Sequence, residues 1–439
     1  MKKRILFYLL GLLFAVISAL SIPMVLRIIC CLIPLLFYGY STVLGYLSRL
    51  ARKSFFNEYL IALAAAFVEL ISLKFVYAAM TLIFFDAIVY FFGLINTATK
   101  RRIAEASVIN LPTARILQGG KTKIVPAEKI ERGNTVVLSD GDVIPVDGII
   151  TNGSALIDYS NLFGSGEFVS AGPSKFCYSG GIVQKGNAFL SCEQPFKNSY
   201  SALVLSRTKS AHKPSLLHKK TSSRGFAVML LFIVAAIITF IVSVIITKAF
   251  AKSVNYFSVM LVLSSSFALL NSTSFLYHNT IVNIRMHGAS IRSEQTIDSL
   301  SEIEAISPSS EIDPSLRNLL EAEGIVMGDN AAEQKITFLY RSKESLRSSK
   351  NHCFKVALGF FDSKADMTIH DGNPVRLLDV IKASKNFKTV LLENIAIVAI
   401  EKILVLLLLF IFNIHATDAM ILEFAAAVAC VLNSSKFLS

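Results

Sequence analysis

The chain alternates long apolar segments with two polar blocks, and this pattern predicts its architecture. About 20 apolar residues suffice to cross a bilayer as a helix. The apolar segments are a first run ending at Ile22, then Ile22–Leu47, Tyr59–Val76, Tyr77–Ile95, Gly225–Thr247, Tyr256–Tyr277, Val390–Phe412 and Ala419–Val431. We therefore expect a membrane α-helical bundle of about eight transmembrane helices, paired as hairpins.

The first apolar run, behind Met1–Arg4, could by itself be a signal peptide. A second run follows it almost at once, and no clear small-residue cleavage site separates the two, which favours a membrane hairpin. On this interpretation residues 1–103 hold four helices. Residues 199–282 hold a basic linker and two helices, and residues 390–439 hold the last two.

The two polar blocks differ in character. Residues 104–198 contain short apolar runs rich in β-branched residues, separated by Gly, Pro, Asp and Asn. This composition predicts a small β-rich domain. Residues 283–389 form the second block, of about 100 residues.

The charge distribution orients the chain in the membrane. Its 43 basic and 31 acidic residues give a net charge of +12, and the cytoplasmic flanks of membrane proteins accumulate Lys and Arg. No interleaved patch of Arg and aromatic residues points to nucleic acid, so the lipid bilayer is the expected partner. We expect a multi-pass plasma-membrane protein with both termini and both polar blocks in the cytoplasm. The basic residues flanking that side are Lys2, Arg49, Lys100, Lys219, Arg285 and Lys436, with Lys248 and Lys252 as exceptions on the other side.

The six cysteines include no C-x-x-C pair. Cys30 and Cys31 are adjacent in an apolar run, and the other four are scattered. This spacing predicts reduced, mostly structural thiols.

One stretch of the first polar block carries a resemblance to a known family. Asp142–Gly148 reads DVIPVDG, and Ile157–Leu162 reads IDYSNL. This stretch resembles the actuator domain of P-type cation ATPases, close to the zinc/cadmium branch, and the resemblance extends over nearly the whole chain. The family continues with T-G-E-S, where this chain has Phe163–Gly166. The family's dephosphorylating Glu falls on Ser165, and Glu167 could substitute only if the loop shifts.

The family's membrane metal motif is also replaced. Its C-P-C falls on Ser265, Ser266 and Phe267, so both thiolates, which suit soft cations, are missing. Because the proline is missing too, the helix need not unwind there. The serines belong to a polar strip that either packs helices together or lines an ion pathway.

The phosphorylation motif D-K-T-G-T is replaced as well. Its Asp falls on Ser309, and a serine cannot form the aspartyl phosphate that divides ATP hydrolysis into two steps. The second polar block is too short for both a phosphorylation domain and a nucleotide-binding domain. We therefore expect residues 283–389 to be a truncated α/β phosphorylation-domain remnant that lacks the nucleotide-binding domain.

The C-terminal end follows the family more closely. Lys402 falls on the membrane Lys of the zinc/cadmium pumps, and Asp418 falls on the Asp of their D-x-G. The resemblance implies that Asp418 could be a metal ligand, with Lys402, Ser265 and Ser266 in the transport pathway. Buried membrane charges are usually functional, but Lys402 and Asp418 could equally form a structural pair.

Two functions remain open. The first is a non-catalytic relative of the heavy-metal ATPases, without a cofactor, that acts as a regulator or scaffold for a protein partner or binds zinc or another divalent cation without pumping it. The alternative is an active zinc/cadmium-type pump with displaced motifs, which would require Mg and ATP.

Overall fold

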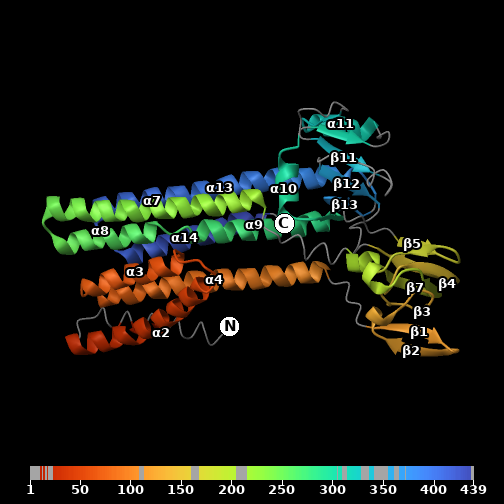
Figure 1. Ribbon diagram of the computed structural model, residues 1–439, viewed down its shortest axis with the longest axis horizontal. Helices are drawn as coiled ribbons and strands as arrows, with labels where there is room; N and C mark the ends of the chain where they lie inside the picture. Colours follow the sequence, from red (N-terminus) through yellow and green to blue (C-terminus); the bar gives the residue numbers. More distant parts are fainter. Residues whose placement is uncertain are drawn as a thin grey trace.

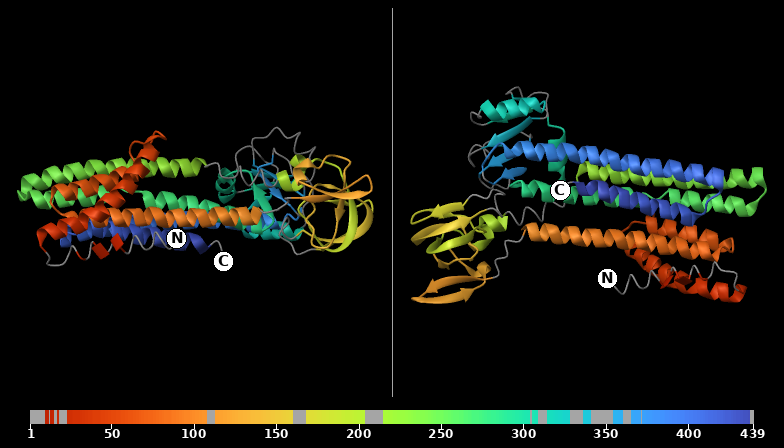
Figure 2. Two further views of the ribbon diagram at one scale, coloured as in Figure 1. Left: turned by 90° about the horizontal axis from the view of Figure 1, so that it is seen from below. Right: turned by 180° about the vertical axis from the view of Figure 1, so that it is seen from behind.

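The computed structural model describes residues 10–11, 13–14, 17, 23–107, 113–159, 168–203, 215–303, 305–308, 314–327, 336–340, 354–359, 365–370 and 372–436. A bundle of long helices forms one part of the molecule, and two β-containing domains lie together at one end of the bundle (Figure 1). The views in Figure 2 show the same division from below and from behind.

Eight helices build the bundle in the described residues: α2 (Met24–Leu50), α3 (Glu58–Ile71), α4 (Phe75–Ser107), α7 (Leu216–Thr247), α8 (Phe250–Leu263), α9 (Phe267–Met286), α13 (Arg376–Phe412) and α14 (Ala416–Ser435). Six spans among them, with α8 and α9 taken together, are long and apolar enough to cross a membrane. The sequence predicts eight spans, and two of those do not appear here. The 14-residue α3 is only about 21 Å long at 1.5 Å per residue, and the first apolar run lies mostly outside the described residues.

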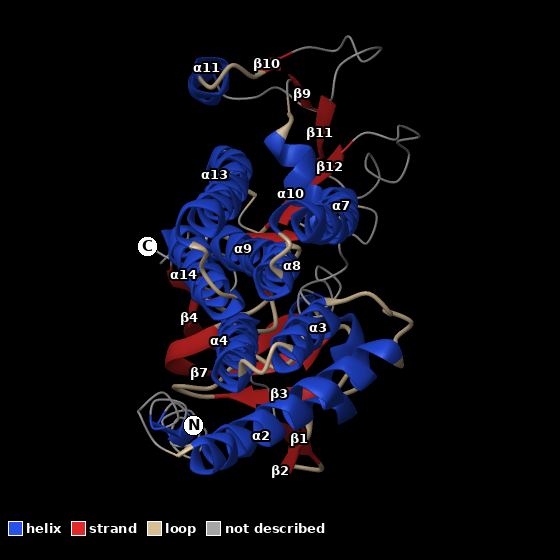
Figure 3. Ribbon diagram, turned by 90° about the vertical axis from the view of Figure 1, so that its left-hand side faces the viewer, coloured by secondary structure: helices blue, strands red, loops and turns tan. Residues whose placement is uncertain are grey.

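The bundle has two layers, which are visible when it is viewed end-on (Figure 3). α3 packs against α8, and α4 packs against α14 and α9, while α2 covers the outer side of α3 and α4. Small buried residues such as Ala62, Ala65 and Ala427 let the helices approach closely. Between the layers the ring of Phe267 lies 5.6 Å from that of Phe92.

The first polar block folds as a seven-stranded antiparallel sheet. Its strands are β1 (Ala114–Gln118), β2 (Lys121–Val125), β3 (Thr135–Leu138), β4 (Gly148–Asp158), β5 (Phe168–Ala171), β6 (Phe176–Cys177) and β7 (Ile182–Cys192). The strand order is β2-β1-β3-β7-β4-β5, with β6 paired to β4. The predicted β-rich domain is thus confirmed.

The thiols of the described residues agree with the predicted structural role. Cys177 and Cys192 lie in the core of this sheet, and burial raises the pKa of the Cys177 thiol to about 11. A thiol with such a pKa stays protonated and unreactive at neutral pH.

The second polar block folds as an α/β domain. Its elements are β8 (Ala289–Ile291), α10 (Glu294–Ser301), β9 (Ala305–Pro308), α11 (Pro314–Ala322), β10 (Val326–Met327), β11 (Ile336–Tyr340), β12 (Phe354–Leu358) and β13 (Met367–Ile369). The order is β10-β9-β11-β12-β13-β8, parallel except for β8. The first turns of α13 complete the core, with Leu377 and Ile381 fully buried.

α10 attaches this α/β domain to the bundle. Tyr277 of α9 donates from its hydroxyl to Asp298 Oδ1 at 2.7 Å. His218 Nδ1, at the start of α7, lies 2.9 Å from Glu294 Oε2. These two contacts fix α10 on the ends of α7 and α9. Burial raises the pKa of Asp298 above its ordinary value.

A buried contact joins the two β-containing domains. Tyr200, in the segment that leaves the first sheet, hydrogen-bonds through its hydroxyl with His370 Nδ1 at the end of β13. Both residues are buried. Tyr178 packs against Tyr200, with the two ring centroids 5.1 Å apart.

Candidate functional site

The helix that the sequence predicts over Tyr256–Tyr277 is broken in its middle. α8 ends before Ser264–Ser266 and α9 begins after them, and all three serines are buried. Without the family's proline the helix need not unwind here, and the structure shows a break nevertheless. Serine hydroxyls can replace helical hydrogen bonds by bonding to nearby backbone. Ser264 Oγ donates to the Leu261 carbonyl at 2.6 Å, and the Phe267 amide donates to Ser265 Oγ at 3.3 Å.

A glutamate from α14 reaches into this break. Glu423 is buried, and its Oε1 accepts from Ser265 Oγ and from the Ala268 amide, both at 3.3 Å. Its Oε2 accepts from Lys402 Nζ of α13 at 2.5 Å. One carboxylate therefore joins α9, α13 and α14 in the interior of the bundle.

Glu401 adds a second carboxylate to this centre. Its Oε2 lies 3.1 Å from Lys402 Nζ, which is an ion-pair distance. The same buried oxygen makes no well-oriented hydrogen bond within the part of the chain that the structure describes. We call Glu401, Lys402 and Glu423 the acid–lysine cluster. With all three groups ionised it carries one net negative charge, which is costly in the interior and favours an added proton or cation.

Of the predicted pathway residues, the structure brings Lys402 and Ser265 together through their common partner Glu423. Ser266 points elsewhere, because its Oγ donates to the Gly225 carbonyl of α7 at 3.1 Å. Asp418 lies in the first turn of α14, where its Oδ2 accepts from the His415 amide at 2.9 Å in a capping box. Its geometry gives Asp418 a capping function, and its role as a metal ligand stays a prediction.

Glu423 is the functional residue that the sequence analysis missed. The family pattern directs attention to Asp418, five positions earlier. A usable signal was nevertheless present, since Glu423 is the one acidic residue after Asp418 in the last apolar segment. An isolated carboxylate in the interior of a membrane helix is rarely without a partner.

A second polar group lies toward the N-terminal end of α14. Thr81 Oγ1 donates to Glu69 Oε2 at 3.2 Å and lies 3.2 Å from Thr417 Oγ1. Glu69 Oε1 is buried and has no hydrogen-bond partner among the described residues. Thr417 precedes Glu423 by six residues, about 9 Å along a helix. This polar group is therefore a separate contact nearer the start of α14.

Three further polar side chains close this end of the bundle. Lys74 Nζ lies 3.2 Å from His415 Nδ1 and 3.3 Å from Asn255 Oδ1. The side chain of Asn255 also donates to the Ile414 carbonyl at 2.8 Å. These contacts join the α3–α4 connection to α8 and to the α13–α14 connection.

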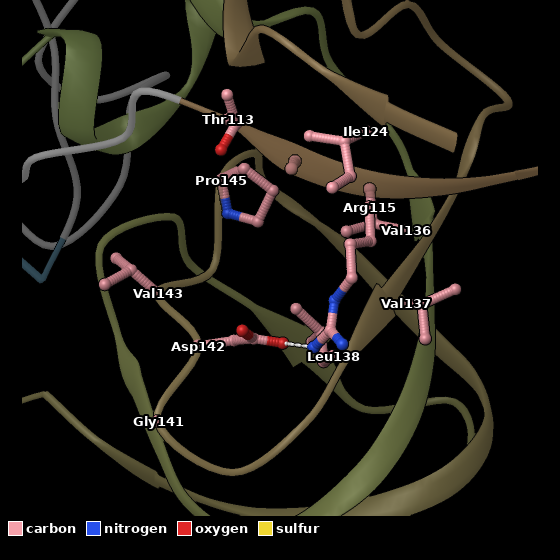
Figure 4. Close-up of a pocket in the computed structure, with 11 residues that line it drawn as sticks. Thr113, Arg115, Ile124, Val136, Val137, Leu138, Gly141, Asp142, Val143 and Pro145 are labelled. Carbon is pink, nitrogen blue, oxygen red and sulfur yellow. Dashed lines mark hydrogen bonds and ion pairs between the residues drawn. The ribbon is translucent and has the colours of Figure 1, made fainter. Parts of the chain in front are cut away.

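The β-rich domain has a pocket of about 350 Å³ beside the DVIPVDG stretch (Figure 4). Arg115 and Asp142 form an ion pair across it. Asp142 Oδ2 also accepts from the Ser139 amide at 2.7 Å. The two charged groups neutralise each other, so Asp142 holds the turn before β4 and gives this pocket no evident chemistry.

The other positions of that stretch are also structural. Asp147 accepts from the Ser179 amide at 2.8 Å and from the Tyr200 amide at 2.7 Å. A Cβ on Gly148 would lie 2.2 Å from the Ser191 carbonyl oxygen, so only glycine fits there. Ile144 and Val146 are fully buried. The motif in this chain therefore builds and fastens the domain.

This architecture can be compared with that of known proteins. Residues 109–209 match the P-type ATPase actuator domain. The chain is 26% identical over 136 residues to the copper-exporting P-type ATPase B of Archaeoglobus fulgidus. It is 20% identical over 271 residues to the cadmium, zinc and cobalt-transporting ATPase of Bacillus subtilis. The chain is related to the heavy-metal P-type ATPases.

The match to these heavy-metal ATPases is partial in length. It covers 31% of this chain and 19% of the A. fulgidus protein, and 61% of this chain and 39% of the B. subtilis protein. The fold resembles the crystal structure of a zinc-transporting PIB-type ATPase in the E2.Pi state, with a TM-score of 0.51, 13% identity and 100% of each chain covered. The chain thus shares a fold with that ATPase and spans less than half the length of both curated relatives.

Three residues at which the resemblance predicts the family's phosphoryl chemistry are not among those that the structure describes. Ser165, Glu167 and Ser309 lie outside the described residues. Within the described ranges, no three His, Cys, Asp or Glu side chains gather closely enough to hold a metal ion. The geometry available for function is therefore that of the acid–lysine cluster and the polar groups along α14.

Proposed function

We propose that the protein is a non-catalytic relative of the heavy-metal P-type ATPases that keeps a cation-responsive centre in the membrane and acts as a regulatory or scaffold protein. The observation that carries this proposal is the acid–lysine cluster at the α8–α9 break. Its buried charges persist in a chain that has serine at the two positions of the family's phosphoryl chemistry, Ser165 and Ser309.

The phosphorylation side supports a non-catalytic role. β9 ends at Pro308 and α11 begins at Pro314, so five residues, 309–313, connect them. Ligands of parallel α/β sheets bind beyond the carboxyl ends of the strands, and in the sequence the residue after β9 is Ser309. A serine at that point offers no carboxylate for an aspartyl phosphate. We therefore assign residues 283–389 to a truncated phosphorylation-domain remnant without a nucleotide-binding domain.

The donor set of the membrane centre indicates which cations it could take. The groups that face one another there are two carboxylates and the Ser265 hydroxyl. Oxygen donors favour hard divalent cations or zinc over copper(I), which prefers thiolates. Lys402 already contacts both carboxylates, so its ammonium group competes with a metal ion. Such a centre binds a divalent cation weakly and releases it readily.

Phosphoenzyme formation decides between the proposal and an active zinc/cadmium-type pump. The purified protein is incubated with radiolabelled ATP and Mg²⁺, quenched in acid, and divided between hydroxylamine and buffer. We expect no hydroxylamine-sensitive label with or without zinc. A label that depends on Mg²⁺ and is removed by hydroxylamine would establish the alternative, and Ser309→Ala would show whether the serine region is involved.

Cation binding tests the membrane centre itself. Isothermal titration of zinc and of manganese into the full-length protein in detergent should give weak binding that Glu423→Gln lowers further. The matched control is Glu393→Gln, which removes a surface carboxylate of α13 that pairs with Lys436. Binding that is unaffected by Glu423→Gln would contradict a cation-responsive centre.

We further propose that the protein lies in the plasma membrane with both termini and both β-containing domains in the cytoplasm. Support comes from the basic flanks and from the position of both domains at one end of the bundle (Figure 1). We expect Asn255 and His415 at the outer end of the bundle. Because Asn255 is buried, the labelling sites are the neighbouring exposed residues Lys248 and Asn413. Single-cysteine variants at these two sites should react with an impermeant maleimide from outside, and variants in residues 113–159 should not. Outside labelling of the latter would reverse the orientation.

A further inference from the structure

A second carboxylate in the membrane lies away from the acid–lysine cluster. Asp86 of α4 accepts a hydrogen bond from Ser41 Oγ of α2 at 2.8 Å. It follows Phe75, the first residue of α4, by 11 residues, about 16 Å along the helix. That distance places it near the middle of a hydrocarbon core about 30 Å thick. The preceding residue, Phe85, packs against Phe267 of α9, whereas Asp86 contacts α2. The two side chains therefore lie on different faces of α4.

Asp86 lines a pocket of about 470 Å³ between α2, α3 and α4. The pocket extends along α4 as far as Thr97, another 16 Å or so from Asp86. It therefore runs from mid-membrane toward the end of the bundle where the β-containing domains lie. Its volume falls in the range of about 300–1,000 Å³ that is typical of small-molecule sites.

Two glycines on facing helices make room for this pocket. A Cβ on Gly45 of α2 would lie 2.2 Å from Cε1 of Tyr59, so glycine there permits the Tyr59 ring to form a wall. A Cβ on Gly93 of α4 would meet nothing within 4 Å. The space at Gly93 is therefore open and could be filled without displacing a neighbour.

The lining combines three features. Asp86 supplies a carboxylate and Ser41 a hydroxyl at one end, Tyr59 and Tyr90 supply aromatic rings, and Val89 and Leu94 supply apolar surface. A carboxylate beside aromatic rings attracts an organic cation through charge and cation–π interactions. A single carboxylate with no metal-binding group of three acids, histidines or cysteines in the described residues suits an ammonium ion better than a metal ion.

We propose that this pocket binds an amphipathic organic cation, with its ammonium or comparable charged group at Asp86 and its apolar body along Tyr59, Tyr90 and Gly93. A free amine and an amine-bearing lipid share this chemistry. The depth of Asp86 favours a free amine, because lipid headgroups lie at the interface. The site is independent of cation binding at the acid–lysine cluster.

The test uses the full-length protein in phosphatidylcholine nanodiscs and the fluorescent cation rhodamine 6G, followed by anisotropy. We expect saturable binding that becomes roughly tenfold weaker in Asp86→Asn, because a contact to a charged group is lost. Gly93→Phe should abolish it by filling the pocket. The uncharged dye Nile red should bind wild type and Asp86→Asn equally.

Matched variants separate the site from general effects. Glu58→Gln removes a carboxylate beside Tyr59 that is not in the pocket lining, and Ile238→Phe adds a ring to the exposed face of α7. Both should leave rhodamine 6G binding unchanged. All variants should elute from size-exclusion chromatography at the same volume as the wild type. The proposal would be overturned if Asp86→Asn and Gly93→Phe bound rhodamine 6G as tightly as the wild type does. It would also be overturned if the wild type showed no saturable binding. Displacement of the dye by added phosphatidylethanolamine would overturn the free amine as the ligand.

Discussion

The β-rich domain and the centre of the membrane bundle relate to their family in opposite ways. The domain contains the DVIPVDG motif, but Asp142, Asp147 and Gly148 stabilise its turns, its strand packing and its connection to the following segment. The bundle has Ser265–Phe267 where the resemblance predicts C-P-C, and it has a broken helix and a buried charged centre around Glu423. A matching motif can thus serve the architecture of a domain, and a buried charged centre can form where the expected motif is absent. Four predictions test this contrast, from the largest expected effect to the smallest.

Val146→Asp should have the largest effect. Val146 is fully buried in the core of the sheet, and an ionised carboxylate without a partner there costs several kcal/mol. We expect the domain to unfold, and limited proteolysis between residues 113 and 203 would detect this. Ile124→Asp is the control, because Ile124 is 67% exposed. If Val146→Asp resisted protease as the wild type does, the motif would not be part of the core.

Glu423→Ala should come next. It leaves Lys402 with Glu401 alone and removes the acceptor of the Ala268 amide. Breaking a buried ion pair costs about 3–5 kcal/mol, and thermal unfolding in detergent should show a loss of that order. Glu393→Ala, in a surface pair with Lys436, should cost about 1 kcal/mol or less. Equal losses in the two variants would mean that the cluster is not a buried centre.

Asp418→Ala should be milder, at about 1 kcal/mol, which is typical of a lost helix cap. The reason is that Asp418 bonds to the His415 amide at the start of α14. Asp418→Asn should recover most of the loss, since an amide oxygen can also cap. A loss as large as that of Glu423→Ala, without recovery by Asn, would return Asp418 to the ion pathway that the family pattern predicts.

Ser265→Ala should have the smallest effect on stability, about 0.5–1 kcal/mol for one hydrogen bond. The Ser265 bond to Glu423 is 3.3 Å long, and the Ala268 amide remains as a second donor to that carboxylate oxygen. Zinc or manganese titration of this variant measures whether the hydroxyl contributes to cation binding. A stability loss above that of Asp418→Ala would show that the serine, rather than the carboxylate, maintains the break.

Much of the architecture could be predicted from the sequence. Apolar runs of about 20 residues predict helices because a helix of that length crosses the bilayer and bonds its own backbone in lipid. The β-branched runs around Val146 predict the sheet. The short α3 could not be predicted, because Ser72–Lys74 interrupts an apolar run with residues that a hydropathy pattern tolerates.

The site was predicted only in part. Lys402 and Ser265 follow from the family pattern, since their positions in it are fixed by spacing. Glu423 and the helix break depend on contacts between α9, α13 and α14, which spacing along one helix does not reveal. The absence of proline also gave no guide to the break, because three adjacent serines and a carboxylate from another helix supply the alternative hydrogen bonds.

The buried contact between Tyr200 and His370 has a kinetic consequence. The hydrogen bond joins the segment leaving the first sheet to the end of β13, and Tyr178 packs against it. Any swing of the β-rich domain past the α/β domain must break that bond and wet both side chains before it can proceed. The contact therefore opposes any such movement, and Tyr200→Phe, which keeps the ring but removes the hydroxyl, would lower that barrier.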